Sequence, residues 1–152
     1  MSATRARAWR LALALAGLVV AADQGLKALV EANIALGEDR DLLGPIQLTH
    51  VGNEGVAFGL AGDGGVLVLL LTMVALGAIL AVFALSAERR GMWVAMGLLA
   101  GGAAGNLADR ARAGAVTDYI DLPAWPAFNL ADIAITAGVA ILALGLLREP
   151  AR

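Results

Sequence analysis

The sequence predicts an all-α membrane protein with four transmembrane helices and a small outward-facing loop region that contains β structure. Two compositional facts and one pattern lead to this prediction. The chain of 152 residues is 60% hydrophobic and only 16% charged, and four of its apolar stretches are long enough to cross a bilayer. Soluble domains have about 25% charged residues. Too few polar side chains therefore remain to cover a surface that faces water.

The four apolar stretches lie at about residues 9–30, 64–85, 91–108 and 128–147. A transmembrane helix needs roughly 17–25 residues, a length that the third stretch barely reaches. The second stretch has no charged residue and is the clearest span. Because backbone groups in lipid must be satisfied within their own segment, all four stretches are predicted to be helices. We expect one membrane-embedded domain over residues 1–152.

The distribution of basic residues predicts how these spans are oriented. If there are four spans, seven arginines share one side of the membrane: Arg5, Arg7, Arg10, Arg89, Arg90, Arg148 and Arg152. Cytoplasmic loops carry an excess of Lys and Arg, so both termini are predicted to be cytoplasmic. The loops at about 31–63 and 109–127 then face outward. The N-terminus has features of a cleavable signal, but its apolar run continues into Asp23 and Lys27, which favours an uncleaved first span.

The outward loops contain the only sign of β structure. Residues 45–51 alternate between apolar and polar side chains, which is typical of a strand. Several glycines follow between Gly52 and Gly65 and indicate turns. The second outward region, which contains Pro123 and Pro126, is predicted as a loop.

The inventory of reactive side chains excludes several kinds of hydrolytic site. There is no cysteine, so the chain has no thiolate nucleophile and no Cys-ligated metal. The only serines, Ser2 and Ser86, are predicted on the cytoplasmic side, and a single histidine, His50, cannot form a two-histidine zinc site. We therefore expect no metal and no cofactor. The net charge of −2 and the scattered basic residues indicate no nucleic-acid partner.

Two aspartates lie where a membrane protein rarely keeps a charge. Asp118 is in the second outward loop, and Asp132 is at the head of the fourth apolar stretch. An ionisable side chain at membrane depth is costly and indicates a functional site. Two carboxyl groups that share a proton can activate water without metal, serine or cysteine. The pair is therefore a candidate for the activation of water.

Together with these two aspartates, other polar residues are predicted at the same level, at the outer ends of the spans or in the loops next to them. The full set comprises Asp23, Asn53, Asn106, Asp109, Arg110, Asp118, Asn129 and Asp132. Such a convergence of polar groups from separate stretches favours a functional site at the outer face.

Several of these residues also have simpler explanations. Asn129 is suited to cap the fourth span, with Asp132 in the first turn, where a carboxylate interacts well with the helix dipole. Asp23 and Lys27 are four residues apart, the spacing of an ion pair on a helix. Asp118 can be read as a solvated loop residue. Only the coincidence of all these residues at one level argues for a site.

Five motifs resemble those of the lipoprotein signal peptidases (signal peptidase II), which are aspartic proteases of the bacterial inner membrane. They occur in the family's order over about residues 23–132: Asp23-Gln24-x-x-Lys27, Asn53-x-Gly55-x-Ala57-Phe58-Gly59, Gly101-Gly102-Ala103-x-Gly105-Asn106-x-x-Asp109-Arg110, Gly114-x-Val116-x-Asp118-Tyr119-Ile120 and Phe128-Asn129-x-Ala131-Asp132. Each motif alone is weak, whereas five in order are specific. One departure is that the stretch between the two aspartates is shorter than is usual in the family.

The resemblance implies that the catalytic pair is Asp118 and Asp132. It implies substrate-binding residues at Asn53, Asn106, Arg110 and Asn129, and supporting residues at Asp23, Lys27, Gly55, Gly105 and Asp109. The implied activity is removal of the signal peptide from a prolipoprotein, with the cut before a diacylglyceryl-modified Cys at the outer face of the inner membrane. The implied partners are the lipidated precursor and membrane lipids, and the enzyme is expected to be a monomer without a cofactor.

The first outward loop is expected to close over the site with Asn53 and Phe58, since its glycines permit motion. An alternative function is a small proton- or ion-coupled transporter, because intramembrane Asp and Arg also mark ion paths. A transporter predicts charges spread through the membrane depth, whereas these gather at one level. A structural assembly subunit is a further alternative, in which replacement of either aspartate leaves function intact.

Overall fold

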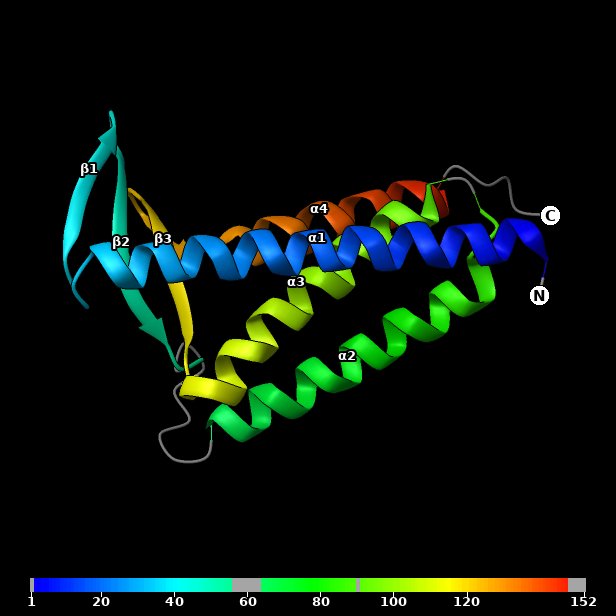
Figure 1. The fold of residues 1–152 in the computed structure, drawn as a ribbon, viewed down its shortest axis with the longest axis horizontal. Coiled ribbons are helices and arrows are strands. Elements are labelled where there is room, and N and C mark those ends of the chain that lie inside the picture. The colour runs from blue at the N-terminus through cyan, green and yellow to red at the C-terminus, as the bar shows by residue number, and fades with distance from the viewer. Residues whose placement is uncertain (1, 56–63, 90, 148–152) are drawn as a thin grey trace.

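Four helices and one sheet make up the computed structural model, which describes residues 2–55, 64–89 and 91–147, apart from the side chains of 64–69 and 146 (Figure 1). The described helices are α1 (Ala3–Asn33), α2 (Gly64–Ser86), α3 (Met92–Ala113) and α4 (Leu130–Leu147). The strands are β1 (Asp39–Leu43), β2 (Ile46–Asn53), β3 (Val116–Leu122) and β4 (Trp125–Phe128). The prediction of a mostly helical fold with a small β region is confirmed.

α1 and α3 are longer than the apolar stretches that predict them, whereas α4 begins two residues later than predicted. α3 continues to Ala113, so Asp109 and Arg110 lie on a helix and not in the loop that was expected. The helix ends at Gly114, which has a φ of 76° and donates its N–H to the Arg110 carbonyl at 3.0 Å. A glycine in the left-handed region is a common helix terminator. The additional turns fix the directions of two predicted site residues.

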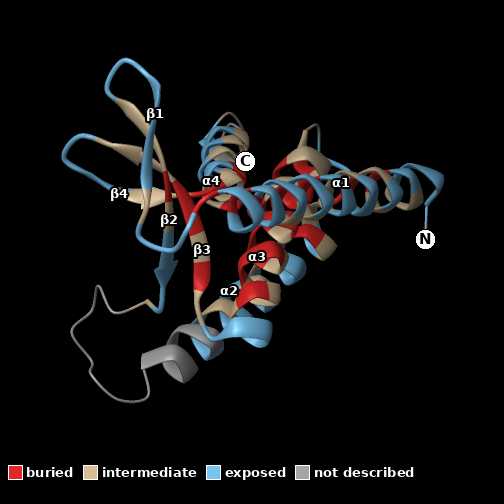
Figure 2. Cartoon of the chain, turned by 60° about the vertical axis from the view of Figure 1, so that its left-hand side comes forward, coloured by how far each residue is buried: buried red, intermediate tan, exposed pale blue. Residues whose placement is uncertain are grey.

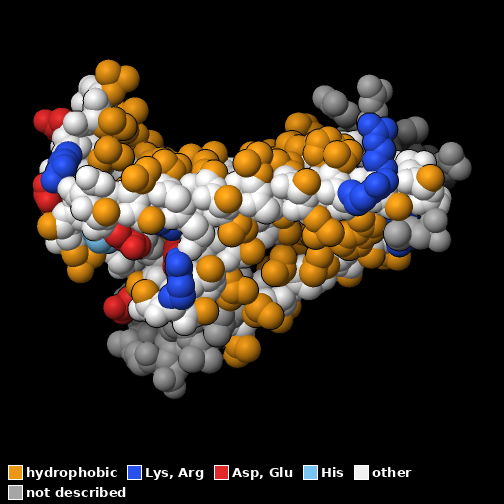
Figure 3. All heavy atoms as spheres, in the orientation of Figure 1, with side chains coloured by type: hydrophobic (Ala, Val, Ile, Leu, Met, Phe, Trp, Pro, Cys, Tyr) orange, Lys and Arg blue, Asp and Glu red, His pale blue; other side chains and the backbone are white. Residues whose placement is uncertain are grey.

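The surface of the helices is apolar along much of its length. Leu18 on α1 is 66% exposed, and Val74 on α2 is 70% exposed. Figure 3 shows hydrophobic side chains along the helices, with most of the charged side chains gathered towards the two ends. By length and composition, α1 is the described helix that is suited to cross a membrane, and shorter apolar helical stretches cover Leu70–Ser86 and Leu130–Gly145. An exposed apolar surface of this extent is typical of contact with lipid.

The sheet lies across one end of the helices, with the antiparallel order β1-β2-β3-β4 (Figure 1). The strand predicted at residues 45–51 is confirmed as β2. The second outward region, predicted as a loop, instead forms β3 and β4. Pro126 is compatible with a strand because β4 is at the edge of the sheet, where a missing N–H is tolerated. The turn between these strands places Ala124 at a φ of 62°.

Glycines on α3 allow its neighbours to approach closely. A β-carbon at Gly101 would lie 2.7 Å from Val19 Cβ on α1, and one at Gly102 would lie 2.5 Å from the Ala131 carbonyl oxygen on α4. Small residues at a helix interface let two backbones come together in this way. Buried residues follow α3 and continue into β3 (Figure 2). Close packing thus brings α1, α3 and the head of α4 together beneath the sheet.

Candidate active site

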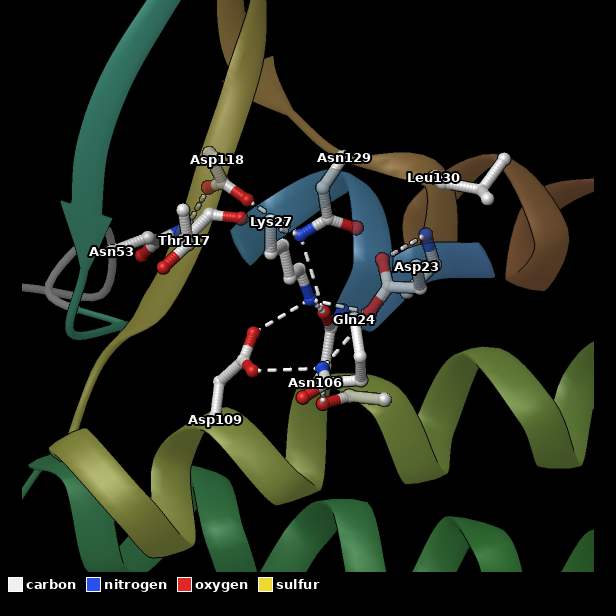
Figure 4. A network of polar contacts seen from close by, with 12 residues as sticks. Asp23, Gln24, Lys27, Asn53, Asn106, Asp109, Thr117, Asp118, Asn129 and Leu130 are labelled. Atoms are coloured by element: carbon white, nitrogen blue, oxygen red, sulfur yellow. Dashed lines mark hydrogen bonds and ion pairs between the residues drawn. The ribbon is translucent and has the colours of Figure 1, made fainter. Parts of the chain in front are cut away.

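The predicted polar residues meet where the sheet joins the helices (Figure 4). They come from α1, α3, the ends of β2 and β3, and the start of α4. Six of them are buried, with exposed fractions from 0% to 6%: Asp23, Lys27, Asn106, Asp109, Asp118 and Asn129. A buried polar or charged group is tolerated only when it is hydrogen-bonded or paired. The contacts among these side chains therefore determine what the site can do.

A helix cap orients Asp132. Asn129 precedes α4, and its side-chain Oδ1 accepts a hydrogen bond from the backbone N–H of Asp132 at 3.0 Å. In return, Asp132 Oδ2 accepts from the backbone N–H of Asn129 at 3.2 Å. This reciprocal arrangement is a capping box. The interpretation of Asn129 and Asp132 as a helix cap is confirmed, and the cap holds the Asp132 carboxyl at the head of α4.

The same asparagine links the two aspartates. Asn129 Nδ2 donates to Asp118 Oδ1 at 2.7 Å, while its backbone N–H serves Asp132. One residue thus donates to both carboxyl groups, although Asp118 lies on β3 and Asp132 on α4. We call the two aspartates the dyad. The fold brings the two aspartates into one polar cluster through this shared donor.

Two more asparagines donate hydrogen bonds to the remaining carboxyl oxygen atoms of the dyad. Asn106 Nδ2 donates to Asp132 Oδ1 at 2.9 Å, and Asn53 Nδ2 donates to Asp118 Oδ2 at 3.0 Å. Each carboxyl therefore accepts a hydrogen bond at both of its oxygen atoms. Such donors favour the ionised carboxylate, whereas burial favours the protonated acid.

Burial has the larger effect on Asp118. Loss of hydration raises the pKa of Asp118 from 3.8 to about 6, the hydrogen bond from Asn53 opposes the rise, and the negative charge of Asp132 adds to it. A carboxyl with a pKa near 6 exchanges its proton readily close to neutral pH. Because the charge of one aspartate disfavours ionisation of the other, the dyad is suited to hold a single proton.

A buried lysine is linked to the dyad through Asn106. Lys27, 1% exposed, forms ion pairs through Nζ with Asp23 Oδ2 at 2.8 Å and Asp109 Oδ2 at 2.6 Å. The pairing of Asp23 with Lys27 along α1, expected from their spacing, is confirmed. A cation in such a place needs partners, since an isolated buried charge is strongly destabilising. The two carboxylates satisfy that need.

Lys27 also determines which way the Asn106 amide faces. Asn106 Oδ1 accepts from Lys27 Nζ at 2.9 Å and from Asn129 Nδ2 at 3.1 Å. An ammonium group has donors and no acceptor. If the amide were reversed, its N–H groups would face the donors of Lys27 and Asn129. Asn106 must therefore direct its Nδ2 to Asp132. The buried charge thereby aims a donor at the dyad.

Two residues that sequence reasoning missed complete this network, Gln24 and Arg112. Gln24 Nε2 donates to Asp109 Oδ1 at 2.9 Å and to the Gly105 carbonyl at 3.2 Å. Arg112 Nη2 pairs with the same Asp109 oxygen at 2.8 Å and donates to Gln24 Oε1. Gln24 was visible as part of the first motif. The three-residue spacing of Asp109 and Arg112 had no meaning while that segment was predicted as a loop.

Arg110 follows Asp109 on α3, and no contact joins it to the dyad within the residues that the structure describes. It is half-buried on the last turns of α3, and its Nε is buried without a hydrogen-bond partner among the residues that the structure describes. Its guanidinium therefore retains a donor for another group. Phe58, expected to close over the site, lies outside the described residues.

The structure explains why glycine occupies both of the predicted glycine positions, one by close packing and the other by its backbone conformation. A β-carbon at Gly105 would lie 2.6 Å from Asp23 Oδ2, so only glycine lets that carboxylate rest against α3. Gly55 has a φ of 78°, in the left-handed region, and donates its N–H to Asn53 Oδ1 at 2.9 Å. This contact occupies the oxygen of the Asn53 amide, so its nitrogen faces Asp118.

A groove beside α4 reaches Asp132 of the dyad. It has a volume of about 580 Å³ and lies between β4 and one face of α4, with a lining that includes Trp125, Phe128, Asp132, Ile133, Thr136 and Ala140. Apart from Asp132 and Thr136, the lining is apolar. Within the described part of the chain, no three His, Asp or Glu side chains are grouped so as to hold a metal ion.

Comparison with known proteins places this chain in a family. A family model described as signal peptidase (SPase) II matches residues 15–148. The lipoprotein signal peptidase of Moorella thermoacetica is 43% identical over 137 residues, which cover 89% of this chain and 91% of that protein. The lipoprotein signal peptidase of Nitratidesulfovibrio vulgaris is 39% identical over 152 residues, with coverage of 93% and 92%.

A solved structure gives the same answer for the fold. It is described as a bacterial membrane enzyme determined by the in meso method at 1.9 Å resolution. It matches with a TM-score of 0.80 and 28% identity, over 91% of this chain and 94% of that one. Since the family model covers most of the chain and the relatives align over most of their length, the chain belongs to the signal peptidase II family.

Proposed function

We propose that this protein is an aspartic endopeptidase that removes the signal peptide from diacylglyceryl-modified prolipoproteins, with the cut before the lipidated Cys. Membership of the signal peptidase II family supports the peptidase activity. The observation that supports the aspartic mechanism is the unit of Asp118, Asn129 and Asp132, in which one residue donates to the buried carboxyl of Asp118 and to the half-buried carboxyl of Asp132. The catalytic residues in this proposal are Asp118 and Asp132.

In the proposed reaction the dyad begins with one proton. The ionised carboxylate takes a proton from a water molecule as the water oxygen bonds to the scissile carbonyl carbon, and the protonated carboxyl gives its proton to the carbonyl oxygen. The tetrahedral diol then returns a proton to the second carboxyl as the C–N bond breaks. The first carboxyl protonates the leaving amine. The dyad ends with one proton, so it is ready for another turnover.

The neighbouring side chains have positioning and binding roles in this proposal. Asn53, Asn106 and Asn129 hold the carboxyl groups and line the space that the peptide enters. Arg110 binds a peptide carbonyl or the developing oxyanion, since its buried Nε has no partner in the described residues. The supporting residues hold this arrangement in place: Asp23, Lys27, Gly55, Gly105 and Asp109.

We also propose that all four helices cross the bilayer as one monomeric peptidase domain of residues 1–152, with both termini cytoplasmic. Arg5, Arg7 and Arg10 lie in the first turns of α1, whose N-terminus is at the end of the molecule opposite the sheet (Figure 1). An excess of basic residues on the cytoplasmic side supports this orientation. The dyad then lies at the outer face, and a lipidated precursor reaches it sideways from the bilayer along the groove beside α4.

A cleavage assay in liposomes tests the proposed activity. The purified protein is incubated with a diacylglycerated precursor, and the products are identified by mass spectrometry. We expect a single cut, directly before the lipidated Cys, and much slower cleavage of the same precursor without lipid. Cleavage at unrelated bonds, or equal rates on both precursors, would contradict the proposal. Ion flux through the protein without any cleavage would instead support a transporter.

A further inference from the structure

The buried charges next to the dyad contain more acid than base. Asp23 is 0% exposed and Asp109 is 4% exposed, and the single buried lysine, Lys27, is paired with both. Two carboxylates and one ammonium leave one negative charge without a counterion. An unpaired buried charge is strongly destabilising. The structure must therefore supply either a second cation or a proton to this cluster.

Arg112 is the second cation. It lies three residues after Asp109 on α3, and its Nη2 is 2.8 Å from Asp109 Oδ1, while 65% of its side chain is exposed. Arg110 does not take this place, because consecutive residues on a helix do not face each other. The charges of four side chains then sum to zero, namely those of Asp23, Lys27, Asp109 and Arg112.

The Asp109 carboxylate is divided between the two cations. Its Oδ2 is 2.6 Å from Lys27 Nζ and has no further partner among the residues that the structure describes. Its Oδ1 accepts from Gln24 Nε2 at 2.9 Å and from Arg112. Arg112 also donates to Gln24 Oε1, the oxygen of the amide whose nitrogen serves Asp109. Arg112 therefore acts on Asp109 both directly and through Gln24.

Lys27 has just enough donors for its three partners (Figure 4). An ammonium group has three donors. They reach Asp23 Oδ2 at 2.8 Å, Asp109 Oδ2 at 2.6 Å and Asn106 Oδ1 at 2.9 Å. Only the last acceptor is uncharged, and hydrogen bonds between two charged groups are the stronger kind. If Asp109 lost its other cation, its excess charge would draw Lys27 away from Asn106.

We propose that Arg112 is a positioning residue for the dyad. By neutralising Asp109, it leaves Lys27 able to hold the Asn106 amide, whose Nδ2 donates to Asp132. The path from the exposed guanidinium to the dyad consists of contacts of 2.6 to 2.9 Å, which are Arg112–Asp109, Asp109–Lys27, Lys27–Asn106 and Asn106–Asp132. The effect on catalysis rests on the proposed function, whereas the effect on the Asn106 amide does not.

Nuclear magnetic resonance reads the Asn106 amide without any catalysis. The protein is labelled with nitrogen-15 asparagine in detergent micelles, and the side-chain amide signals of Asn106 are assigned with an Asn106→Ala variant. We expect Arg112→Gln to shift these signals and Arg112→Lys, which keeps the charge, to return them toward their wild-type positions. The control Arg40→Gln removes the exposed ion pair with Glu38 on the sheet and should leave the signals in place.

Cleavage of a diacylglycerated precursor in liposomes reads the consequence for the dyad. Arg112 is not among the residues that line the groove beside α4, so we expect Arg112→Gln to lower kcat severalfold and to leave KM near its wild-type value. Small misplacements of a catalytic group are costly, with about 1 Å worth roughly 10²-fold in rate. Arg112→Lys should recover most of kcat, and Arg40→Gln should keep wild-type kinetics.

A double-mutant cycle tests whether Arg112 acts through Asp109. In an Asp109→Asn background the charge that Arg112 neutralises is gone, so Arg112→Gln should change kcat and the Asn106 signals no further. Losses that simply add would show that Arg112 acts by another route, and would contradict the inference. If Asp109→Asn does not fold, the comparison of Arg112→Gln with Arg112→Lys decides.

Three further results would overturn the inference. The first is an Arg112→Gln variant with wild-type Asn106 signals. The second is a shift of those signals without any change in kcat, which would uncouple the network from the dyad. The third is an equal loss of kcat in Arg112→Gln and Arg112→Lys with a lower unfolding temperature, which would show a role in folding alone. If the wild-type protein cleaves no precursor, the peptidase proposal fails, while the Asn106 signals still test the action of Arg112.

Discussion

Asn129 serves both a helix and a pair of acids. Its backbone and side chain close the capping box of α4 with Asp132, and its amide nitrogen reaches Asp118 at 2.7 Å. Caps are worth about 1 kcal/mol to helix stability, and here the same geometry fixes two carboxyl groups. The local folding of α4 and the assembly of the proposed catalytic site are therefore coupled at one residue.

The raised pKa of Asp118 predicts a pH dependence of activity. The proposed chemistry needs one protonated and one ionised carboxyl. Burial raises the pKa of Asp118 to about 6, so the singly protonated dyad loses its proton as pH rises through that value. We expect kcat/KM to fall on the alkaline side, with a midpoint near pH 6, and to fall again in acid when both carboxyls are protonated. A rate that is flat from pH 5 to pH 8 would contradict a shared proton.

Removal of the Lys27 charge predicts a loss of stability. Lys27→Met would leave Asp23 and Asp109 buried without their cation, a change that typically costs roughly 3–5 kcal/mol. We expect a clearly lower unfolding temperature in detergent. The control Arg40→Met removes only an exposed pair with Glu38, and should change the unfolding temperature little. If Lys27→Met unfolds at the wild-type temperature, the buried pairs contribute nothing measurable.

At the level of residues, sequence reasoning predicted which polar side chains cluster and missed several of the hydrogen bonds and ion pairs between them. The pairing of Asp23 with Lys27 and the cap at Asn129 follow from spacings of three or four residues along one helix, which a sequence displays directly. The contacts of Gln24 and Arg112 with Asp109 depend on how α1 packs against α3. No local pattern contains that information.

At the scale of elements, α3 is the centre of the arrangement. Its glycines let α1 and α4 approach, and its last turns carry Asn106 and Asp109 into contact with Lys27. The sheet contributes Asp118 on a central strand, where pairing on both sides limits its movement. Rigid elements, and not loops, therefore hold the groups proposed to react.

Gly105→Ala tests the close contact between α1 and α3. The added β-carbon would lie 2.6 Å from Asp23 Oδ2, so the carboxylate or the helix must shift. Overpacking of this kind costs about 1–3 kcal/mol, and we expect a lower unfolding temperature and slower cleavage. Gly77→Ala on α2, with no atom within 4 Å of the new carbon, is the matched control and should be tolerated. Equal behaviour of the two variants would show that the contact is not tight.

The elements that sequence reasoning missed were β1, β3, β4 and the end of α3. Long apolar stretches identified all four helices, because hydrophobicity is visible along the chain itself. β3 and β4 depend on pairing, since β3 forms next to β2, which is more than sixty residues earlier in the sequence by their cross-strand register. Pro126 argued against a strand, and only its place at the edge of the sheet makes it acceptable.

At the scale of the whole molecule, the polar and charged side chains are concentrated at the two ends of the long axis. The proposed catalytic network lies at the sheet end, basic residues begin α1 at the other end, and the helices between them expose apolar side chains (Figures 1 and 3). A protease that acts on lipid-anchored substrates needs its site at the membrane face, within reach of the bilayer. This arrangement supports the proposal that the dyad lies at the outer membrane face.

The proposed orientation predicts which positions are accessible from outside the cell. The chain has no cysteine, so single cysteines can be introduced without background. In spheroplasts, a membrane-impermeant maleimide should label Asp41→Cys, on the exposed strand β1 at the sheet end. It should label Ser2→Cys, at the start of α1, only after the membrane is permeabilised. Labelling of Ser2→Cys in intact spheroplasts would contradict cytoplasmic termini.

The most direct test of the aspartic mechanism measures turnover of a diacylglycerated precursor by Asp118→Asn and by Asp132→Asn, in liposomes, beside wild type. Each variant keeps the size of the side chain and loses the acid, so we expect folding to be retained, as judged by unfolding temperature. Since acid–base catalysis contributes roughly 10²–10⁴-fold, we predict that kcat falls by roughly 10³-fold or more in each variant. A folded variant of either kind that cleaves at the wild-type rate would contradict catalysis by the dyad.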